Sequence, residues 1–406
     1  MSIQQITVPK INPAVHGSVS SKKLFDGSVV SQVNTIIHNA VNMKASDIHL
    51  EPYEESFRLR YRLDGVLQKM GELSPLQKDA ILSRIKIMAK LDIAEKRRPQ
   101  DGRIRIEKDK KTVDLRVSTL PTEFGEKIVL RILDKSEQRL ELRQLGFDET
   151  NLSEFRKAIS NPYGMILVTG PTGSGKTTTL YAALSELNTP EVNITTIEDP
   201  IEYNLPGINQ TQVRSDIGLT FSAALRAILR QDPNIIMVGE VRDKETAEIA
   251  IRSALTGHLV FSTLHTNDAP SAITRLIDMG IEPFLVASSV RLVMAQRLVR
   301  RICSQCKTEY NPEPEVVAEL GLQSQHKFFH GSSCERCNGT GFKGRVALIE
   351  LMPVSDALSE LVVKESGAHE LKKQALAEGM VTLRQSGVEK VKEGVTTVEE
   401  VIRETT

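Results

Sequence analysis

The chain has 406 residues, which at about 150 residues per domain indicates two or three domains. Hydrophobic residues make up 40% and charged residues 26%, as in globular proteins and unlike disordered or membrane-spanning chains. Lysine plus arginine total 52, and aspartate plus glutamate also total 52. This balance argues against a protein whose main role is to bind nucleic-acid phosphates, because such proteins carry an excess of basic residues. No apolar run approaches the roughly 18–20 residues of a membrane helix. The N-terminus also lacks the basic start and apolar stretch of a signal peptide, so we expect a cytoplasmic protein.

The first part of the sequence predicts a short tail followed by an α+β domain over residues 28–134. Residues 1–27 carry scattered Pro, Gly and Ser with little periodicity, which is typical of a tail or linker. Apolar residues at helical spacing predict helices over 29–42 and 75–91. Asp64-Gly65 fits a hairpin turn. Period-two alternation predicts half-buried antiparallel strands at 57–63, 103–106, 113–117 and 128–133.

The next part of the sequence predicts a different architecture. Residues 135–150 are charged and poor in apolar residues, as a linker is, and an α/β domain is predicted over 151–300. Helices are predicted at 151–160, 176–187 and 244–256, and short apolar strands at 164–169, 193–197, 235–238 and 259–263. Such alternation indicates a mainly parallel, three-layer α/β core. A cysteine-bearing subdomain at 301–345 and a helical subdomain at 346–406 complete the predicted organisation.

Residues 170–177 match the phosphate-loop pattern GxxxxGK[ST] at every fixed position. The segment follows a predicted strand and opens a predicted helix, which is the context that supports the motif. The glycines let backbone N–H groups turn towards phosphate oxygens, and the helix dipole adds positive potential there. Lys176 supplies a charge for the β- and γ-phosphates, and Thr177 supplies a hydroxyl for Mg²⁺. The predicted nucleotide-binding residues are Gly170, Pro171, Thr172, Gly173, Ser174, Gly175, Lys176, Thr177 and Thr178.

Two acids and two histidines are the candidates for catalysis. Glu240 follows the strand 235–238, where proteins with this loop place an acid that holds magnesium or orients water; Gly239 occupies the usual aspartate position. Glu198 ends another strand and is a second candidate for positioning Mg²⁺ or the attacking water. His258 and His265 bracket a third strand, and the polar turn after His265 suits a γ-phosphate sensor. The alternatives are a solvated glutamate and structural histidines.

All four cysteines lie in one segment as two CxxC pairs: Cys303, Cys306, Cys334 and Cys337. In a reducing compartment such pairs favour a metal site over disulfides. Four thiolates suit one tetrahedral Zn²⁺, and four protein ligands leave no open position, so the predicted role is structural. The alternative is four reduced cysteines without a ligand. Residues 307–333 separate the pairs and predict a small subdomain between them.

Four segments resemble the signature boxes of the type II/type IV secretion ATPase superfamily. They are 170–178 (GPTGSGKTT), 197–202 (IEDPIE), 229–243 (LRQDPNIIMVGEVRD) and 256–269 (TGHLVFSTLHTNDA). Earlier matches are ASDIH at 45–49, RPQDGR at 98–103 and DLRVST at 114–119, so the resemblance extends from about Asp26 to the end. The CxxC pairs disfavour the pilus retraction branch. Residues 124–128, 189–194 and 205–210 most resemble the type IV pilus assembly branch, with the type II secretion branch a close second.

The resemblance implies a PAS-like first domain, a RecA-like ATPase domain and a homo-hexameric ring. It also implies that arginines of the first domain reach the nucleotide phosphates, namely Arg103, Arg116 and Arg131. From the residues alone, these would be exposed strand arginines. Longer members carry a further N-terminal domain that docks to the membrane complex; little sequence precedes Asp26, so no docking function is predicted.

The implied function is a motor that hydrolyses ATP with Mg²⁺ and works an inner-membrane platform protein to polymerise pilins. The alternative within the superfamily is the type II secretion ATPase, which drives pseudopilus assembly. Either would be cytoplasmic and would contact the inner membrane only through partners. Two other classes stay open: a nucleic-acid translocase, against which the neutral charge and the 4% aromatic content count, and a non-hydrolysing nucleotide switch, which would not need the acids and arginines.

Overall fold

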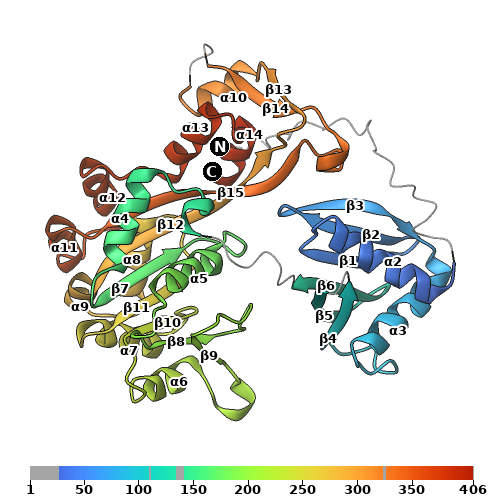
Figure 1. Cartoon of the computed structure of the whole chain (residues 1–406), viewed down its shortest axis with the longest axis horizontal. Helices are drawn as coiled ribbons and strands as arrows, with labels where there is room; N and C mark the ends of the chain where they lie inside the picture. The colour runs from blue at the N-terminus through green and yellow to red at the C-terminus, as the bar shows by residue number, and fades with distance from the viewer. Residues whose placement is uncertain (1–26, 109–110, 134–140, 323–325, 406) are drawn as a thin grey trace. The chain divides into compact units, whose positions relative to one another are not determined.

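The structure, a computed structural model, describes residues 27–108, 111–133, 141–322 and 326–405 (Figure 1). These residues form two compact units. The first unit comprises 27–133 together with Ile302–Glu309 and Phe329–Gly344, and the second comprises the other described residues. Nearly all of the predicted tail, residues 1–26, and the first part of the predicted linker, residues 135–140, lie outside the described residues. The finer domain boundaries stay a prediction.

The first unit contains a six-stranded antiparallel sheet in the order β3-β2-β1-β6-β5-β4. The strands are β1 (Asp47–Pro52), β2 (Phe57–Leu63), β3 (Val66–Leu73), β4 (Gln100–Lys108), β5 (Lys111–Thr122) and β6 (Gly125–Leu133). Helices α2 (Val29–Asn42) and α3 (Lys78–Met88), the latter preceded by the 3-10 helix η1 (Pro75–Gln77), share an apolar core with this sheet. The alternate side chains of the strands form the other, charged face of the sheet.

The predicted α+β architecture of this unit is confirmed, and the structure adds two strands. β2 alternates strictly between buried and half-buried residues, as its sequence predicts. Asp64 and Gly65, which join β2 to β3, both have positive φ (47° and 87°), the geometry of a type I′ hairpin turn. β1 is buried along its whole length, although its sequence alternates polar Asp47, His49 and Glu51 with apolar Ile48 and Leu50, a pattern from which the strand could have been predicted.

The second unit contains a seven-stranded sheet in the order β15-β12-β7-β11-β10-β8-β9. Neighbouring strands from β12 to β9 in this order pair in parallel. The strands are β7 (Gly164–Thr169), β8 (Ile194–Glu198), β9 (Asn209–Gln212), β10 (Ile235–Val238), β11 (Leu259–Leu264), β12 (Val290–Ile302) and β15 (Phe342–Pro353). This is the mainly parallel core that the sequence predicts.

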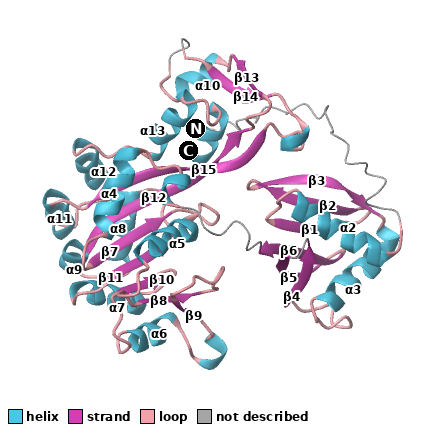
Figure 2. Cartoon of the chain, in the orientation of Figure 1, coloured by secondary structure: helices cyan, strands magenta, loops and turns pink. Residues whose placement is uncertain are grey.

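Helices cover both faces of this sheet (Figure 2). On one face, Ile166 and Val168 of β7 pack with α4 (Glu149–Ile159) and α5 (Lys176–Leu187). On the other face, Met165 and Leu167 pack with α6 to α9 and with C-terminal helices that include α11 and α12. These helices are α6 (Phe221–Ile228), α7 (Lys244–Leu255), α8 (Ala269–Asp278), α9 (Pro283–Ser289), α11 (Asp356–Val363) and α12 (Ala368–Ala377). The three-layer α/β sandwich is therefore confirmed. The short 3-10 helices η3 (Leu142–Leu145) and η4 (Ser215–Ile217) lie in connections.

A buried carboxylate joins the C-terminal helices to this core. Glu350 on β15 is 1% exposed. One of its oxygens accepts from the N–H of Ala269, the first residue of α8, at 2.8 Å, and the other accepts from the N–H of Leu383, the first residue of α13 (Leu383–Lys392), at 3.2 Å. Two helix N-termini therefore converge on one side chain. The last helix is α14 (Val398–Thr405).

The segment between the cysteine pairs carries its own small elements. β13 (Lys307–Tyr310) and β14 (Phe328–Gly331) form a two-stranded sheet, α10 (Pro314–Glu319) lies between them in the chain, and the 3-10 helix η5 (Glu335–Cys337) follows. Among the helices of the described residues, none is both long and apolar enough to cross a membrane.

Candidate nucleotide site and cysteine cluster

The phosphate loop joins the carboxyl end of β7 to the first turn of α5, as the motif predicts. Gly170, Gly173 and Gly175 have φ values of 146°, 84° and 89°, which L side chains rarely adopt. A Cβ atom at Gly170 would also lie 2.5 Å from the carbonyl oxygen of Gln296. The loop can therefore curl as it does only with glycine at these positions.

Lys176 folds back over this loop. Its Nζ donates to the carbonyl oxygens of Gly170 and Pro171, at 2.8 and 3.1 Å. Burial lowers the pKa of Lys176 to about 8; Glu240 acts in the opposite direction, and Arg297 lowers the pKa further. The ammonium group therefore lies among backbone dipoles that a phosphate group can replace, close to an acid and a second cation.

Glu240 and His265 lie together at the same edge of the sheet. Glu240 follows β10, and His265 follows the neighbouring strand β11; His265 Nε2 lies 3.5 Å from Glu240 Oε2. Arg242 forms an ion pair with the other oxygen of Glu240 and lies 3.8 Å from Asp199. Arg242 was not predicted from the sequence, whereas Asp199 belongs to the pair of acids that the sequence places at the end of β8. The position of Arg242 after the end of β10 is the signal that could have found it.

The other two predicted catalytic residues do not join this group. Glu198 is 3% exposed, and its carboxylate accepts from Tyr181, Thr196 (2.6 Å) and Gln210 (3.1 Å). Burial raises its pKa, and these hydrogen bonds oppose that rise. A catalytic role for Glu198 stays a prediction, and it would require this cluster to open.

His258 lies at the opposite edge of the sheet from the phosphate loop. It precedes β11, its carbonyl oxygen accepts from the N–H of Gly164 at the start of β7, and its Nδ1 contacts the carbonyl oxygen of Ser253 at 3.0 Å. The six-residue strand β11, at about 3.3 Å per residue, separates it from His265. A catalytic role for His258 stays a prediction, and of the two histidines only His265 lies near Glu240 and the phosphate loop.

The three arginines predicted for the nucleotide lie side by side in one cross-strand row of the first unit. Arg103 of β4 is directly opposite Arg116 of β5, and Arg116 is directly opposite Arg131 of β6. Arg131 is in turn opposite Asp47 of β1, which it contacts at 3.0 Å, and Arg62 contacts the same carboxylate at 3.5 Å. Like charges on directly opposite residues destabilise a sheet. A bound anion would relieve this repulsion.

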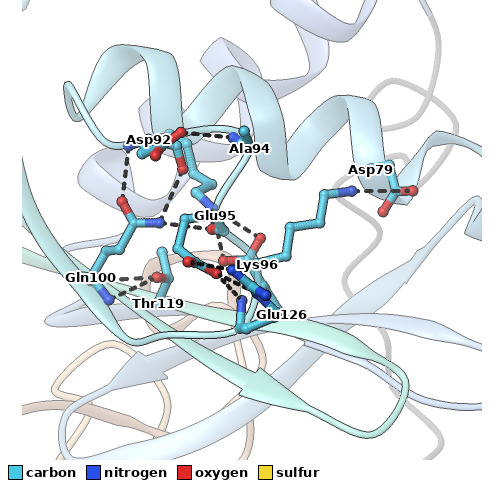
Figure 3. A network of polar contacts seen from close by, with 10 residues as sticks. Asp79, Asp92, Ala94, Glu95, Lys96, Gln100, Thr119 and Glu126 are labelled. Carbon is cyan, nitrogen blue, oxygen red and sulfur yellow. Dashed lines mark hydrogen bonds and ion pairs between the residues drawn. The ribbon is translucent and has the colours of Figure 1, made fainter.

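A polar network anchors the segment that leads into the strand of Arg103 (Figure 3). Lys86, which is fully buried, donates to Glu126 at 2.8 Å and to the carbonyl oxygen of Glu95 at 2.7 Å. Gln100, the first residue of β4, donates to the carbonyl oxygens of Glu95 (2.9 Å) and Asp92 (3.0 Å). The start of β4 is therefore fixed from the interior of the unit.

The four cysteines form one cluster whose geometry fits a metal. Their sulfur atoms all lie within 4.8 Å of one another. Three of the sulfur pairs, Cys303–Cys334, Cys306–Cys337 and Cys334–Cys337, are 3.7, 3.8 and 3.7 Å apart. Four thiolates around Zn²⁺ at about 2.3 Å would be about 3.8 Å apart. The N–H groups of Cys334 and Gly341 both point to the sulfur of Cys337 at 3.2 Å, as donors that support a metal-bound thiolate do.

A complete phosphate loop at the carboxyl edge of a parallel sheet, with Glu240 and His265 at the same edge, defines a P-loop nucleotide-binding protein. The profile of the family described as Type II/IV secretion system protein matches residues 23–403, and the chain belongs to this family. It is an ATPase, as the named relatives are, and the resemblance found in the sequence is confirmed.

The curated relatives come from both branches that the sequence resembles. The type IV pilus assembly ATPase PilB of Myxococcus xanthus is 53% identical over 391 residues, which cover 95% of this chain and 69% of that protein. PilB of Thermus thermophilus is 49% identical over 390 residues, and the chain spans only 44% of it. The type II secretion system ATPase E of Vibrio cholerae is 49% identical over 382 residues, which cover 94% of this chain and 76% of that protein.

Solved structures have the same fold. The ATPase DotB of Legionella pneumophila aligns with a TM-score of 0.67 at 21% identity, covering 91% of this chain and 94% of that one. The pilus retraction motor PilT, solved with bound ADP, aligns with a TM-score of 0.61 at 27% identity, covering 91% and 96%. The predicted RecA-like fold class is therefore confirmed.

Proposed function

We propose that the chain is a homo-hexameric motor ATPase that hydrolyses ATP to power type IV pilus assembly through an inner-membrane platform protein. The observation that carries the proposal is the group formed by Lys176, Glu240 and His265 at one edge of the sheet, in a chain that is 53% identical to a pilus assembly ATPase over 391 residues. Assembly of a pseudopilus for type II secretion is the alternative, supported by the 49% identity to a type II secretion ATPase.

Each residue of the site has a separate proposed role. Lys176 and the N–H groups of residues 170–178 hold the phosphates. Glu240 orients the attacking water and takes up its proton, and His265 contacts the γ-phosphate. Arg103 and Arg116, with Arg131, neutralise charge that develops on the transferred phosphoryl group.

Two metal ions belong to this proposal. Mg²⁺ neutralises phosphate charge when bound, and the Thr177 hydroxyl would hold it. Zn²⁺ would be held by the four cysteines in a closed structural site. We propose that this ATPase works in the cytoplasm at the inner membrane and reaches that membrane only through its partners.

Two variants test the proposed site. Lys176→Ala should lose nucleotide binding, because the loop loses its charge for the phosphates. Glu240→Gln should bind a fluorescent ATP analogue normally and turn ATP over at least about 10²-fold more slowly, because the amide cannot accept a proton. Normal hydrolysis by Glu240→Gln would remove Glu240 from the proposed site.

The biological role needs a second experiment. Expression of the chain in one bacterium that lacks its pilus assembly ATPase, and in another that lacks its type II secretion ATPase, should restore pili and leave secretion unrestored. The Lys176→Ala variant is the control for expression without activity. Restored secretion without pili would favour the alternative, and stimulation of turnover by DNA would favour a nucleic-acid translocase.

A further inference from the structure

Strand β12 runs past the end of β7 and flanks the phosphate loop. Ala295 pairs with Thr169, the last residue of β7, so Gln296 and the residues after it lie beside the loop itself. Gln296 is 2% exposed. Its Oε1 accepts from the hydroxyl of Thr179 on α5 at 2.7 Å, and its Nε2 would lie 2.7 Å from a Cβ atom at Gly175. The wall of the loop is therefore built by β12.

The guanidinium group of the next residue, Arg297, is buried beside the phosphate loop. Arg297 is 8% exposed. Its Nη1 donates to the carbonyl oxygen of Gln296 at 3.2 Å and would lie 3.2 Å from a Cβ atom at Gly170. Its Nη2 donates to both the carbonyl oxygen and the side-chain oxygen of Asn267, at 3.1 and 3.2 Å. One side chain therefore contacts the wall of the phosphate loop and the loop that carries His265.

The charge of Arg297 is not neutralised at close range. It makes no ion pair with a carboxylate within the described ranges of the chain, and the cation Lys176 is its neighbour in the same site. Burial lowers the pKa of Arg297, while the more distant acids Glu404, Glu350 and Asp268 act in the opposite direction. A buried cation without a paired acid costs stability, and the contacts that Arg297 makes point to another contribution.

The loop of His265 is attached to the phosphate loop at two points. On one side, the hydroxyl of Thr169 contacts the hydroxyl of Thr266 at 2.8 Å and accepts from the N–H of Thr266 at 2.9 Å. On the other side, Arg297 holds Asn267. His265 immediately precedes these two anchored residues, so its position relative to Glu240 depends on both anchors.

We propose that Arg297 is a positioning residue for ATP hydrolysis, which acts through Asn267 to hold His265 against the phosphate loop. This inference rests on the proposed role of His265. Arg297 does not bind the nucleotide in this scheme; it sets the distance between the phosphate loop and the sensor.

The test measures ATP turnover and binding of a fluorescent ATP analogue by the full chain. Arg297→Gln should lower kcat at least about tenfold, equivalent to about 1.4 kcal/mol of barrier, while the Kd of the analogue changes by less than about threefold. Asn267→Ala keeps one of the two acceptors, so it should lower kcat less. In the Arg297→Gln background, Asn267→Ala should cost nothing further, because the two residues act as one unit.

The controls separate positioning from folding. Arg301→Gln, an exposed residue of the same strand, should change neither quantity. Arg297→Lys keeps the buried charge and one donor group, so it should fold if Arg297→Gln does not and should recover part of kcat. Additive costs in the double variant, or an unchanged kcat in both Arg297 variants, would overturn the inference.

One further variant separates the proposed role of His265 from the inference on Arg297. His265→Ala should slow turnover on its own. If turnover is normal in His265→Ala, the proposed role of His265 fails, and a low kcat in Arg297→Gln would then show that Arg297 acts through another group, which also overturns the inference. If His265→Ala is slow and Arg297→Gln is normal, only the inference on Arg297 fails.

Discussion

Gly239 explains why the acid of this site is Glu240. A Cβ atom at position 239 would lie 3.2 Å from the carbonyl oxygen of Ile197 and 3.3 Å from the Cα of Glu198. A side chain there would press on the backbone of the neighbouring strand β8. The carboxylate therefore comes one residue later, where the strand has ended and the longer glutamate side chain reaches His265.

Glu51 gives a prediction about acid stability. It is 4% exposed, and it lies on the charged face of β1 with Arg60 at 2.7 Å and Lys127 at 3.1 Å. Burial raises the pKa of Glu51, but hydrogen bonds from Arg60 and Lys127 prevail and lower it to about 2. A carboxyl group with a depressed folded-state pKa stabilises the fold above its unfolded value, near 4.5. That stability is lost as the pH falls towards 2.

Glu51→Gln should therefore destabilise the first unit by about 1–3 kcal/mol at pH 7. The variant should also lose less stability than the parent between pH 4.5 and pH 2. Thermal unfolding followed by circular dichroism at several pH values is the measurement. Glu72→Gln is the matched control, because Glu72 pairs with Lys69 on the exposed surface and should contribute little. Equal acid sensitivity of Glu51→Gln and its parent would contradict the prediction.

At the scale of single residues, the sequence could predict a site residue only where its position at the end of a strand or helix determines where it lies in the fold. Lys176, Glu240 and His265 follow the ends of buried strands, so the parallel sheet brings them to one edge. The sequence could not predict the partners of Glu198, because Tyr181 and Gln210 reach it from other elements. Arg297 was not predicted, because no local sequence pattern shows that β12 extends beyond the end of β7 and along the phosphate loop.

At the scale of elements, the alternation of polar and apolar residues predicts most strands of the first sheet, but it does not predict how the charged residues of neighbouring strands are aligned. Alternation finds β2 and the arginine-bearing strands, because one face is apolar. The sequence of β1 also alternates, with Asp47, His49 and Glu51 between Ile48 and Leu50, but this strand was not predicted. What the pattern does not show is that the side chains of Arg60, Arg62 and Lys127 cover the acids of β1, so that no residue of the strand is exposed. The cross-strand register that aligns the three arginines depends on pairing between strands far apart in the sequence, which no local pattern contains.

The arginine row gives a prediction at this scale. Alanine at Arg103 or Arg116 should lower ATP turnover by roughly 10³-fold, the lower end for arginines that stabilise a transferred phosphoryl group. Binding of a fluorescent ATP analogue should persist, because the phosphate loop is unchanged. Removal of the Arg103 charge from the row should leave the stability of the first unit equal or higher.

A neighbouring arginine provides the control for the row. Arg105 lies on the same strand as Arg103 and contacts Asp114 at 2.7 Å. Arg105→Ala should hydrolyse ATP at the parent rate. If the Arg103 and Arg116 variants also keep that rate, the row is strand surface and has no part in hydrolysis.

At the scale of the whole molecule, we expect the metal site of the cysteine cluster to stabilise one part of the chain, so that its loss leaves the rest folded. The apolar cores of the second unit lie within its own sheet and helices and do not include the cysteines. Metal removal should therefore unfold the cysteine-bearing parts, residues 303–309 and 329–337, while Val317, Leu320 and Phe328 stay packed against α13 and α14 and the phosphate loop still binds nucleotide. Binding of Zn²⁺ by such sites contributes roughly 10–16 kcal/mol in small peptides near neutral pH, so the local effect should be complete.

Metal content and limited proteolysis check this prediction. Purified protein should contain about one Zn²⁺ per chain, as one set of four thiolates binds one ion. Cys334→Ser should lower that content and bring early cleavage between the cysteine pairs, and Ser304→Ala, beside the first cysteine, should do neither. Freely reactive thiols in protein purified without chelators, with no bound metal, would contradict the zinc site.

The convergence of two helix N-termini on Glu350 has a consequence for anyone who wishes to exchange parts between such motors. A chain cut after β15 would keep the buried carboxylate but lose the Leu383 N–H that it accepts from. It would also uncover the face of the core that Leu358, Val362, Leu371 and Ala375 close. In a chimera that borrows only the C-terminal helices of a relative, the first N–H of the grafted helix would have to reach Glu350 at the same position. Successful grafts should transfer β15, α8 and the C-terminal helices together, as one piece.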